Sequence, residues 1–213
     1  MKRFWIMLFV LVLLVGCGKS STPVDTTYTS NELKADNTYH EFPTSYMVNR
    51  GNNYFDYQSG YECAAFASAY LLRYFGETAS GLELFKTLPD KTPDGSGAYP
   101  KAIINLFESK GYEANYIVDA SIETLKYEIS KGNPVIVFIH VEVDAKSVHW
   151  THYVPIVGYD EDYFYFAESL NDKANYKEEG LPYNRRTDIA TFKNLWKNVD
   201  GLWDYPYYQI TKI

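Results

Sequence analysis

Apolar residues follow two different patterns in the two halves of the chain. In the first half they recur at helical spacing between glycines, whereas in the second half they form alternating or continuous runs bounded by turn residues. The pattern predicts helices over 64–75, 81–88, 100–110, 122–131 and 189–197 and strands over 112–118, 134–143, 152–159, 163–168 and 205–210. This order indicates an α+β fold, with an N-terminal helical half packed on a C-terminal antiparallel sheet.

The N-terminus has the order of residues typical of a secretory signal. Lys2 and Arg3 precede an apolar run over 4–15, which is short for a membrane span and ends in a small residue before Cys17. The order resembles the bacterial lipobox, in which a signal peptidase cuts before the cysteine and diacylglycerol is attached to its sulfur. The alternative is an uncleaved anchor with a chance cysteine.

These features divide the chain into three parts. Residues 1–16 are the predicted signal peptide, 17–38 a polar and flexible lipid-anchored tether, and 39–213 one folded domain. The lipid on Cys17 would hold the domain at the cell membrane, on the extracytoplasmic face. The formal net charge of −7 disfavours a phosphate-binding surface, so nucleic acid is not an expected partner.

The second of the two cysteines stands at the predicted start of a helix. Cys63 precedes the helical run over 64–75, which Gly76 would end. First-turn N–H groups have no partner inside the helix and the dipole is positive there, so a thiolate at this place is stabilised relative to a thiol. A free cysteine also packs commonly as a small buried hydrophobe, so the helix alone does not make Cys63 a nucleophile.

Four histidines are available as a base for thiol chemistry. His140 lies within an apolar strand and His40 precedes the core of the domain, which favours structural roles for both. His152 is the preferred base because it opens the predicted strand over 152–159. A zinc site built on His149 and His152 lacks the spacing of a helical metal motif, so neither a metal nor another cofactor is expected.

The order of these residues resembles a known family. Gln58 precedes the helix of Cys63, the run His-Tyr-Val-Pro-Ile-Val-Gly-Tyr-Asp begins at His152, and the next strand ends in Glu168. The chain looks like the bacteriocin-processing, double-glycine leader peptidases, which are cysteine peptidases of papain-like fold. The resemblance implies a papain-like domain with Cys63 as nucleophile, His152 as base, Glu168 orienting the histidine and Gln58 in the oxyanion hole.

Two departures from the family pattern affect these assignments. Glu168 stands where relatives usually have aspartate, and Asn171 is the alternative if the strand ends later. Pro155 lies inside the histidine strand, where it removes a ladder hydrogen bond and predicts an edge strand or a bulge.

The resulting hypothesis is a lipid-anchored extracytoplasmic cysteine peptidase that hydrolyses bonds in a peptide or protein outside the cytoplasm. An acyltransferase or amidase with the same cysteine and histidine is one alternative. A non-catalytic surface binding or immunity lipoprotein on a peptidase-like fold is another, and the glutamate in place of aspartate keeps it open.

Overall fold

The computed structural model describes residues 32–141, 150–171, 182–197, 199 and 204–213. The helices in this part are α1 (Cys63–Tyr74), α2 (Gly81–Thr87), α3 (Pro100–Glu108), α4 (Ile122–Ser130) and α5 (Ile189–Trp196). The strands are β1 (Glu32–Lys34), β2 (Tyr46–Met47), β3 (Tyr112–Val118), β4 (Val135–Val141), β5 (Trp150–Tyr159), β6 (Tyr163–Phe166), β7 (Arg185–Asp188) and β8 (Tyr207–Lys212). Every helix and strand predicted from the apolar pattern is present, with ends shifted by at most two residues.

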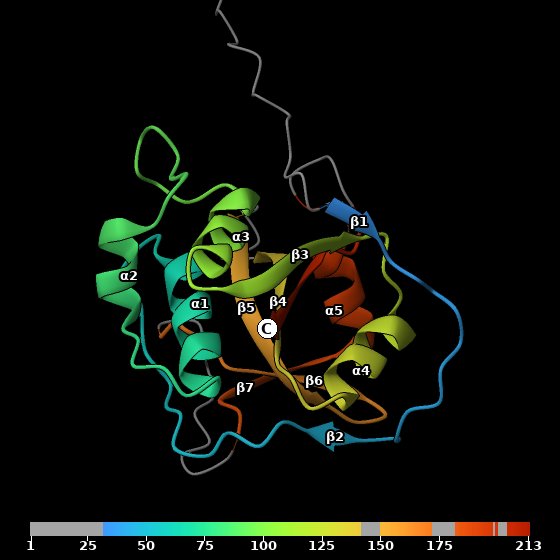
Figure 1. Ribbon diagram of the computed structural model, residues 1–213. Coiled ribbons are helices and arrows are strands. Elements are labelled where there is room, and N and C mark those ends of the chain that lie inside the picture. Colours follow the sequence, from blue (N-terminus) through green and yellow to red (C-terminus); the bar gives the residue numbers. More distant parts are fainter. Residues whose placement is uncertain (1–31, 142–149, 172–181, 198, 200–203) are drawn as a thin grey trace, which may run out of the picture.

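The strands form one sheet in the order β1-β3-β8-β4-β5-β6-β7, and β2 pairs with β5 off this path. All pairs are antiparallel except β1 with β3, so the sheet is mixed at one edge. Figure 1 shows α1, α2 and α3 on one side of the sheet and α4 and α5 on the other. The predicted α+β class is confirmed.

The central strands are buried on both faces because helices cover both sides. Along β4, Ile136 and Phe138 join the core that contains α1 and α3, whereas Val135 and Val137 join the core that contains α4 and α5. This alternation explains why β4 reads as a continuous apolar run rather than as a pattern with one polar face.

Helix α1 is the central helix of the first core. Its alanines, Ala64, Ala65, Ala67 and Ala69, are all nearly fully buried, and small side chains at these places let the helix lie close to β5. The chain leaves the helix through Gly76, whose φ of +91° lies in the left-handed region that a glycine adopts without strain. The helix thereby brings its first residue, Cys63, to the start of β5.

Strand β5 is central, not at an edge. It lies between β4 and β6, so the edge position considered for Pro155 is wrong. The predicted bulge is present, because the pairing of β5 with β6 shifts register between Ile156 and Gly158. Pro155 has no N–H to donate to the ladder. It lies next to the residues at which the pairing is already irregular, so the sheet tolerates a proline in this central strand.

Besides the two-residue β2, two strands were not predicted. Residues 32–34, assigned to the flexible tether, form β1 and extend the ordered domain to before Tyr39. Residues 185–188 form β7 and begin inside a stretch with no apolar alternation. Both lie at the ends of the sheet, where backbone pairing needs no buried side-chain pattern.

The predicted signal peptide over 1–16, Cys17 and the tether as far as residue 31 lie outside the described residues. Within the described ranges, no helix has the length and apolar character needed to cross a membrane.

We expect Gly158→Ala to destabilise the domain. A Cβ atom at this position would clash with the Met47 sulfur and lie 2.7 Å from the Tyr46 carbonyl oxygen, so β2 would have to move off β5. Overpacking of this kind costs about 1–3 kcal/mol of unfolding free energy, measurable by urea denaturation. At Gly60 the nearest atom to a Cβ is 3.5 Å away, so Gly60→Ala is the matched control. Equal stability of the two variants would contradict the close approach of β2 to β5.

Candidate active site

Cys63 is the first residue of α1 and the one cysteine among the residues that the structure describes. Its thiol is free and half-buried. Residues 64–72 of the helix behind it are fully buried, so the thiol stands at the point where the helix reaches the surface. The position combines a helix N-terminus, as the sequence predicts, with access to ligands.

The His152 ring lies beside Cys63 near the start of β5. The ring is only 3% exposed, and its Nε2 is 2.8 Å from Oε1 of Glu168. The Cys63 side chain interacts with the ring as well. Because Nε2 is taken by Glu168, Nδ1 is the ring nitrogen that remains available to the sulfur. Burial alone would lower the pKa of His152, but the Glu168 charge and the hydrogen bonds to Cys63 and Glu168 outweigh it and raise the pKa.

Glu168 is a buried carboxylate with partners on both oxygens. Oε1 accepts hydrogen bonds from His152 Nε2 and from the Leu170 backbone N–H, each at 2.8 Å. Oε2 lies 3.6 Å from Nη1 of Arg185. Burial raises the pKa of Glu168, but His152, the Leu170 amide and Arg185 together lower it below its usual value. Glu168 is therefore an anion at neutral pH, and it favours a positive charge on His152.

The Gln58 side chain is fixed in the turn before α1. Its Oε1 accepts a hydrogen bond of 2.6 Å from Ser169 Oγ, and its Nε2 donates one of 2.6 Å to the Gly60 carbonyl. The backbone is held too, because Gln58 N donates to Ser169 O at 2.9 Å. Since a primary amide has two N–H groups, one remains after the bond to Gly60, on a side chain that lines the same cleft as Cys63.

The structure thus brings Cys63, His152, Glu168 and Gln58 into one site. Glu168 contacts His152, whereas the alternative, Asn171, is exposed. The other histidines lie elsewhere or outside the described residues. His40 stacks on Tyr127 with ring centroids 4.2 Å apart, His140 lines a different cavity, and His149 is among the undescribed residues.

The part of the chain described by the structure contains no group of three His, Cys, Asp or Glu side chains placed to hold a metal ion.

Comparison with known families gives a match to the Peptidase_C39 like family over residues 46–202. The chain belongs to this family. The matched range begins at β2, includes Gln58 and Cys63, and extends beyond α5, so it contains the whole site. A search among curated proteins finds no match.

Three solved structures share the fold. A putative C39-like peptidase from Bacillus anthracis superimposes with a TM-score of 0.59 at 18% identity, covering 78% of this chain and 98% of that one. The peptidase domain of Streptococcus ComA, a bi-functional ABC transporter in a quorum-sensing pathway, gives 0.55 at 14% identity, covering 76% and 100%. The Carica candamarcensis cysteine protease CMS1MS2 gives 0.50 at 15% identity, covering 80% and 99%. The predicted papain-like fold is confirmed.

Three residues that contact the site of this Peptidase_C39 like protein were not identified from the sequence. Ser169 orients the Gln58 amide, and Arg185 pairs with Glu168. Asn184 is 1% exposed; its Oδ1 accepts from the Glu168 N–H at 2.7 Å and its Nδ2 donates to the Glu168 carbonyl at 2.9 Å. Asn184 and Arg185 lie in the polar stretch over 171–186, which carries no periodic signal. Only their contacts with Glu168, which is distant in the chain, show their role.

A cleft of about 240 Å³ opens over the thiol. Tyr61 and Trp150, each two residues before Cys63 or His152 in the chain, line it with ring centroids 5.3 Å apart, and both rings are exposed. Further lining residues come from the loop before α3: Thr92, Ser96, Gly97 and Ala98. The half-buried thiol is therefore accessible from this cleft.

We expect Glu168→Gln to lower the fraction of Cys63 that is present as the thiolate. The amide oxygen can still accept from His152 Nε2, but the negative charge is lost, so burial then lowers the pKa of His152 and the thiolate–imidazolium pair becomes less populated. Alkylation of Cys63 by iodoacetamide near pH 6 should slow by roughly tenfold, which corresponds to one pKa unit. Glu161→Gln, an exposed carboxylate in the turn after β5, is the control and should react as the wild type does. An unchanged rate in Glu168→Gln would show that the charge does not support the thiolate.

Proposed function

We propose that this chain is a cysteine peptidase that hydrolyses peptide bonds through a thioester acyl-enzyme. The observation that carries the proposal is the continuous contact from the half-buried Cys63 thiol through the His152 ring to the buried, ionised Glu168. A cysteine used only for packing needs no base, and a histidine used only for packing needs no anion behind it. The membership of the Peptidase_C39 like family supports the same reaction class.

In the first step the Cys63 proton resides on His152, and the thiolate attacks the carbonyl carbon of the scissile peptide bond. The carbonyl oxygen becomes an anion, which the remaining N–H of Gln58 and the backbone N–H of Cys63 stabilise. The tetrahedral intermediate then breaks its C–N bond. The His152 imidazolium gives its proton to the leaving amine, and the acyl group stays on the sulfur as a thioester.

In the second step water replaces the amine. Neutral His152 takes a proton from water as it attacks the thioester carbon, and the same two donors stabilise the second oxyanion. The C–S bond breaks, the carboxylic acid product leaves, and the Cys63 thiolate is restored beside the imidazolium. Glu168 holds Nε2 throughout, so Nδ1 keeps facing the sulfur and the substrate.

The proposed substrate is a peptide or protein outside the cytoplasm. The exposed Tyr61 and Trp150 rings offer an apolar surface beside the sulfur for a side chain of such a substrate. The net charge of −7 argues against nucleic acid as a partner. The proposed anchor is the lipid on Cys17, which would hold the enzyme on the extracytoplasmic face of the cell membrane after removal of residues 1–16.

We expect Cys63→Ser to lower peptide hydrolysis by at least about 10³-fold, because a serine hydroxyl at this place is a far weaker nucleophile than a thiolate. The free energy of unfolding should change by about 1 kcal/mol or less, because the side chain is half-buried and nearly the same size. Peptide hydrolysis and thermal melting check both parts. A large loss of stability with retained hydrolysis would show that Cys63 is a packing residue.

The binding-protein and transferase alternatives are separated by two further measurements. A thiol-directed activity probe should label the wild type near pH 6 and fail to label His152→Ala, whereas slow labelling equal in both favours a non-catalytic binding protein. With an added amine, the products should remain those of hydrolysis. Transfer of the acyl group to the amine in place of water would favour an acyltransferase.

We expect Cys17→Ala to release the protein from the membrane fraction, because the sulfur that would carry the diacylglycerol is absent. The released protein should hydrolyse peptides at the same rate as the detergent-solubilised wild type. Fractionation of cells followed by immunoblotting checks the location. Retention of Cys17→Ala in the membrane fraction would contradict lipid anchoring through this residue.

A further inference from the structure

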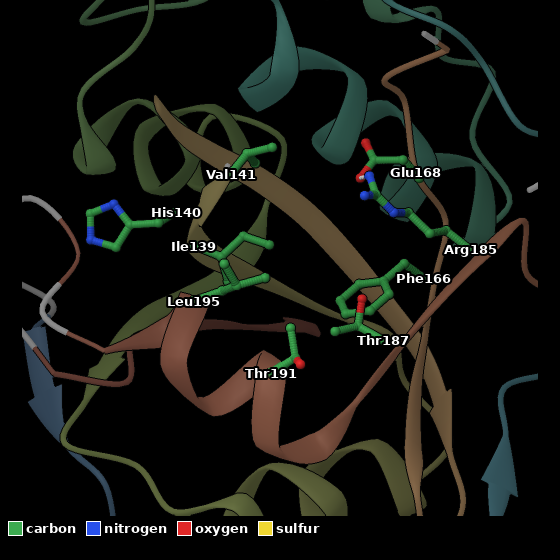
Figure 2. Close-up of a pocket in the computed structure, with 9 residues that line it drawn as sticks. All are labelled: Ile139, His140, Val141, Phe166, Glu168, Arg185, Thr187, Thr191 and Leu195. Carbon is green, nitrogen blue, oxygen red and sulfur yellow. Dashed lines mark ion pairs between the residues drawn. The ribbon is translucent and has the colours of Figure 1, made fainter. Parts of the chain in front are cut away.

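The two oxygens of Glu168 have different surroundings. Oε1 is shared between His152 and the Leu170 amide at hydrogen-bonding distance, whereas Oε2 forms an ion pair with Arg185 Nη1 at 3.6 Å. Figure 2 shows the Arg185 side chain reaching to the Glu168 carboxylate. The carboxylate is 4% exposed, so this guanidinium is the positive charge that meets it on the side away from His152.

The backbone of Arg185 is fixed with respect to Glu168. Arg185 is the first residue of β7 and pairs with Phe166 of β6, two residues before Glu168. The preceding residue, Asn184, bonds both the N–H and the carbonyl of Glu168 through its side chain. Two neighbouring residues therefore hold Glu168. Asn184 binds its backbone, and Arg185 pairs with its carboxylate.

Arg185 is separated from the cleft over the thiol. It lines a second cavity, of about 190 Å³, together with Glu168 and side chains of β4, β6, β7 and α5 (Figure 2). Neither Cys63 nor His152 lines this cavity, and Arg185 does not line the cleft. Arg185 is thus placed to act on the reacting sulfur through Glu168 and not by contact with a substrate in the cleft.

We propose that Arg185 is a positioning residue that keeps Glu168 ionised and aimed at His152, and so extends the reactive state of Cys63 to lower pH. The inference rests on the proposed cysteine peptidase function, since it concerns the charge state of the same site. Arginine suits this role because its guanidinium stays protonated at every pH at which the protein is folded.

The charged and titratable groups that surround Glu168 determine the sign of the effect. They come from four elements and one connecting segment: His152 of β5, Arg185 of β7, His140 of β4 across the second cavity, Cys63 of α1 behind the histidine, and Tyr57, whose hydroxyl is 3.5 Å from Asn184 Nδ2.

Without the Arg185 charge, the pKa of Glu168 rises. The carboxylate then takes up a proton sooner as pH falls, the imidazolium loses its counter-charge, and the thiolate is reprotonated. Near neutral pH Glu168 is ionised with or without Arg185, so the effect is confined to the acidic side.

The test measures the rate of Cys63 alkylation by iodoacetamide against pH. The full chain with Cys17→Ala is used because Cys63 is then its only cysteine. Arg185→Gln removes the charge and Arg185→Lys retains it. Arg186→Gln is the matched control, because Arg186 is the next residue of β7, is exposed, and has its guanidinium 4.5 Å from the centre of the Tyr163 ring.

For Arg185→Gln we expect the acidic midpoint of the profile to move up by about 0.5–1 pH unit, a discounted value for a partly exposed guanidinium beside a carboxylate. At a pH below the midpoint, this shift makes the alkylation of Cys63 roughly three- to tenfold slower, whereas the rate near neutral pH is unchanged. Arg185→Lys should stay close to the wild type, and Arg186→Gln should superimpose on it. Thermal melting verifies that each variant is folded.

Three results would overturn the inference: an Arg185→Gln profile identical to the wild type, an equal loss of rate at every pH, or a shift in Arg185→Lys as large as that in Arg185→Gln. The first result would show that Arg185 is not coupled to the reactivity of Cys63. The second would show that the substitution loosens the site at every pH. The third would show that the reactivity depends on the shape of the Arg185 side chain and not on its charge. Failure of the proposed function has a different signature. The protein with Arg185 in place would then show the alkylation profile of an ordinary thiol, with a midpoint of about 8.5. Alternatively, its thiol would be reactive but the protein would not hydrolyse peptides.

Discussion

The ion pair between His152 and Glu168 is the interaction on which the rest of the site depends. Both side chains are removed from water, and desolvation of this kind costs several kcal/mol per ion unless other contacts offset it. Here the Leu170 amide, the Arg185 guanidinium and the Cys63 thiol supply those contacts. The end of β6 and the starts of β7, β5 and α1 therefore converge on one point in the fold.

The segment 168–170 connects the two halves of the site. Its first residue holds His152, its second holds the Gln58 amide through a hydroxyl, and its third donates a backbone N–H to the carboxylate. The bridge between Gln58 and Leu170 ties the turn before α1 to the same segment. The His152 ring and the Gln58 amide, which both line the cleft of Cys63, are thus positioned by a single short piece of chain.

Much of this arrangement could be predicted from local signals. The start of α1 at Cys63, its end before Gly76 and the cap of α4 by Ser121, whose hydroxyl accepts from the Thr124 N–H, all depend on residues close in the chain. The burial of β4 follows from its apolar run. The positions of Gln58, Cys63, His152 and Glu168 were accessible because their order resembles that of a known family.

The parts that escaped prediction depend on contacts between distant residues. Asn184 and Arg185 lie in a polar segment whose sequence gives no period, and each acquires its role from Glu168, which is 16 or more residues away. Strands β1 and β7 are held by backbone pairing at the ends of the sheet, which polar side chains permit as readily as apolar ones. Polar networks of this kind become visible only when the chain is folded.

The division of the site between the two halves of the chain has a consequence for biosynthesis. During synthesis the segment with Gln58 and α1 emerges first, before the strand that carries His152 and before the segment 168–170. The contacts of His152 with Glu168 and of Gln58 with Ser169 form only when this later part of the chain has been made. In the proposed enzyme, the thiol of Cys63 therefore meets its base only after the C-terminal strands have been synthesised.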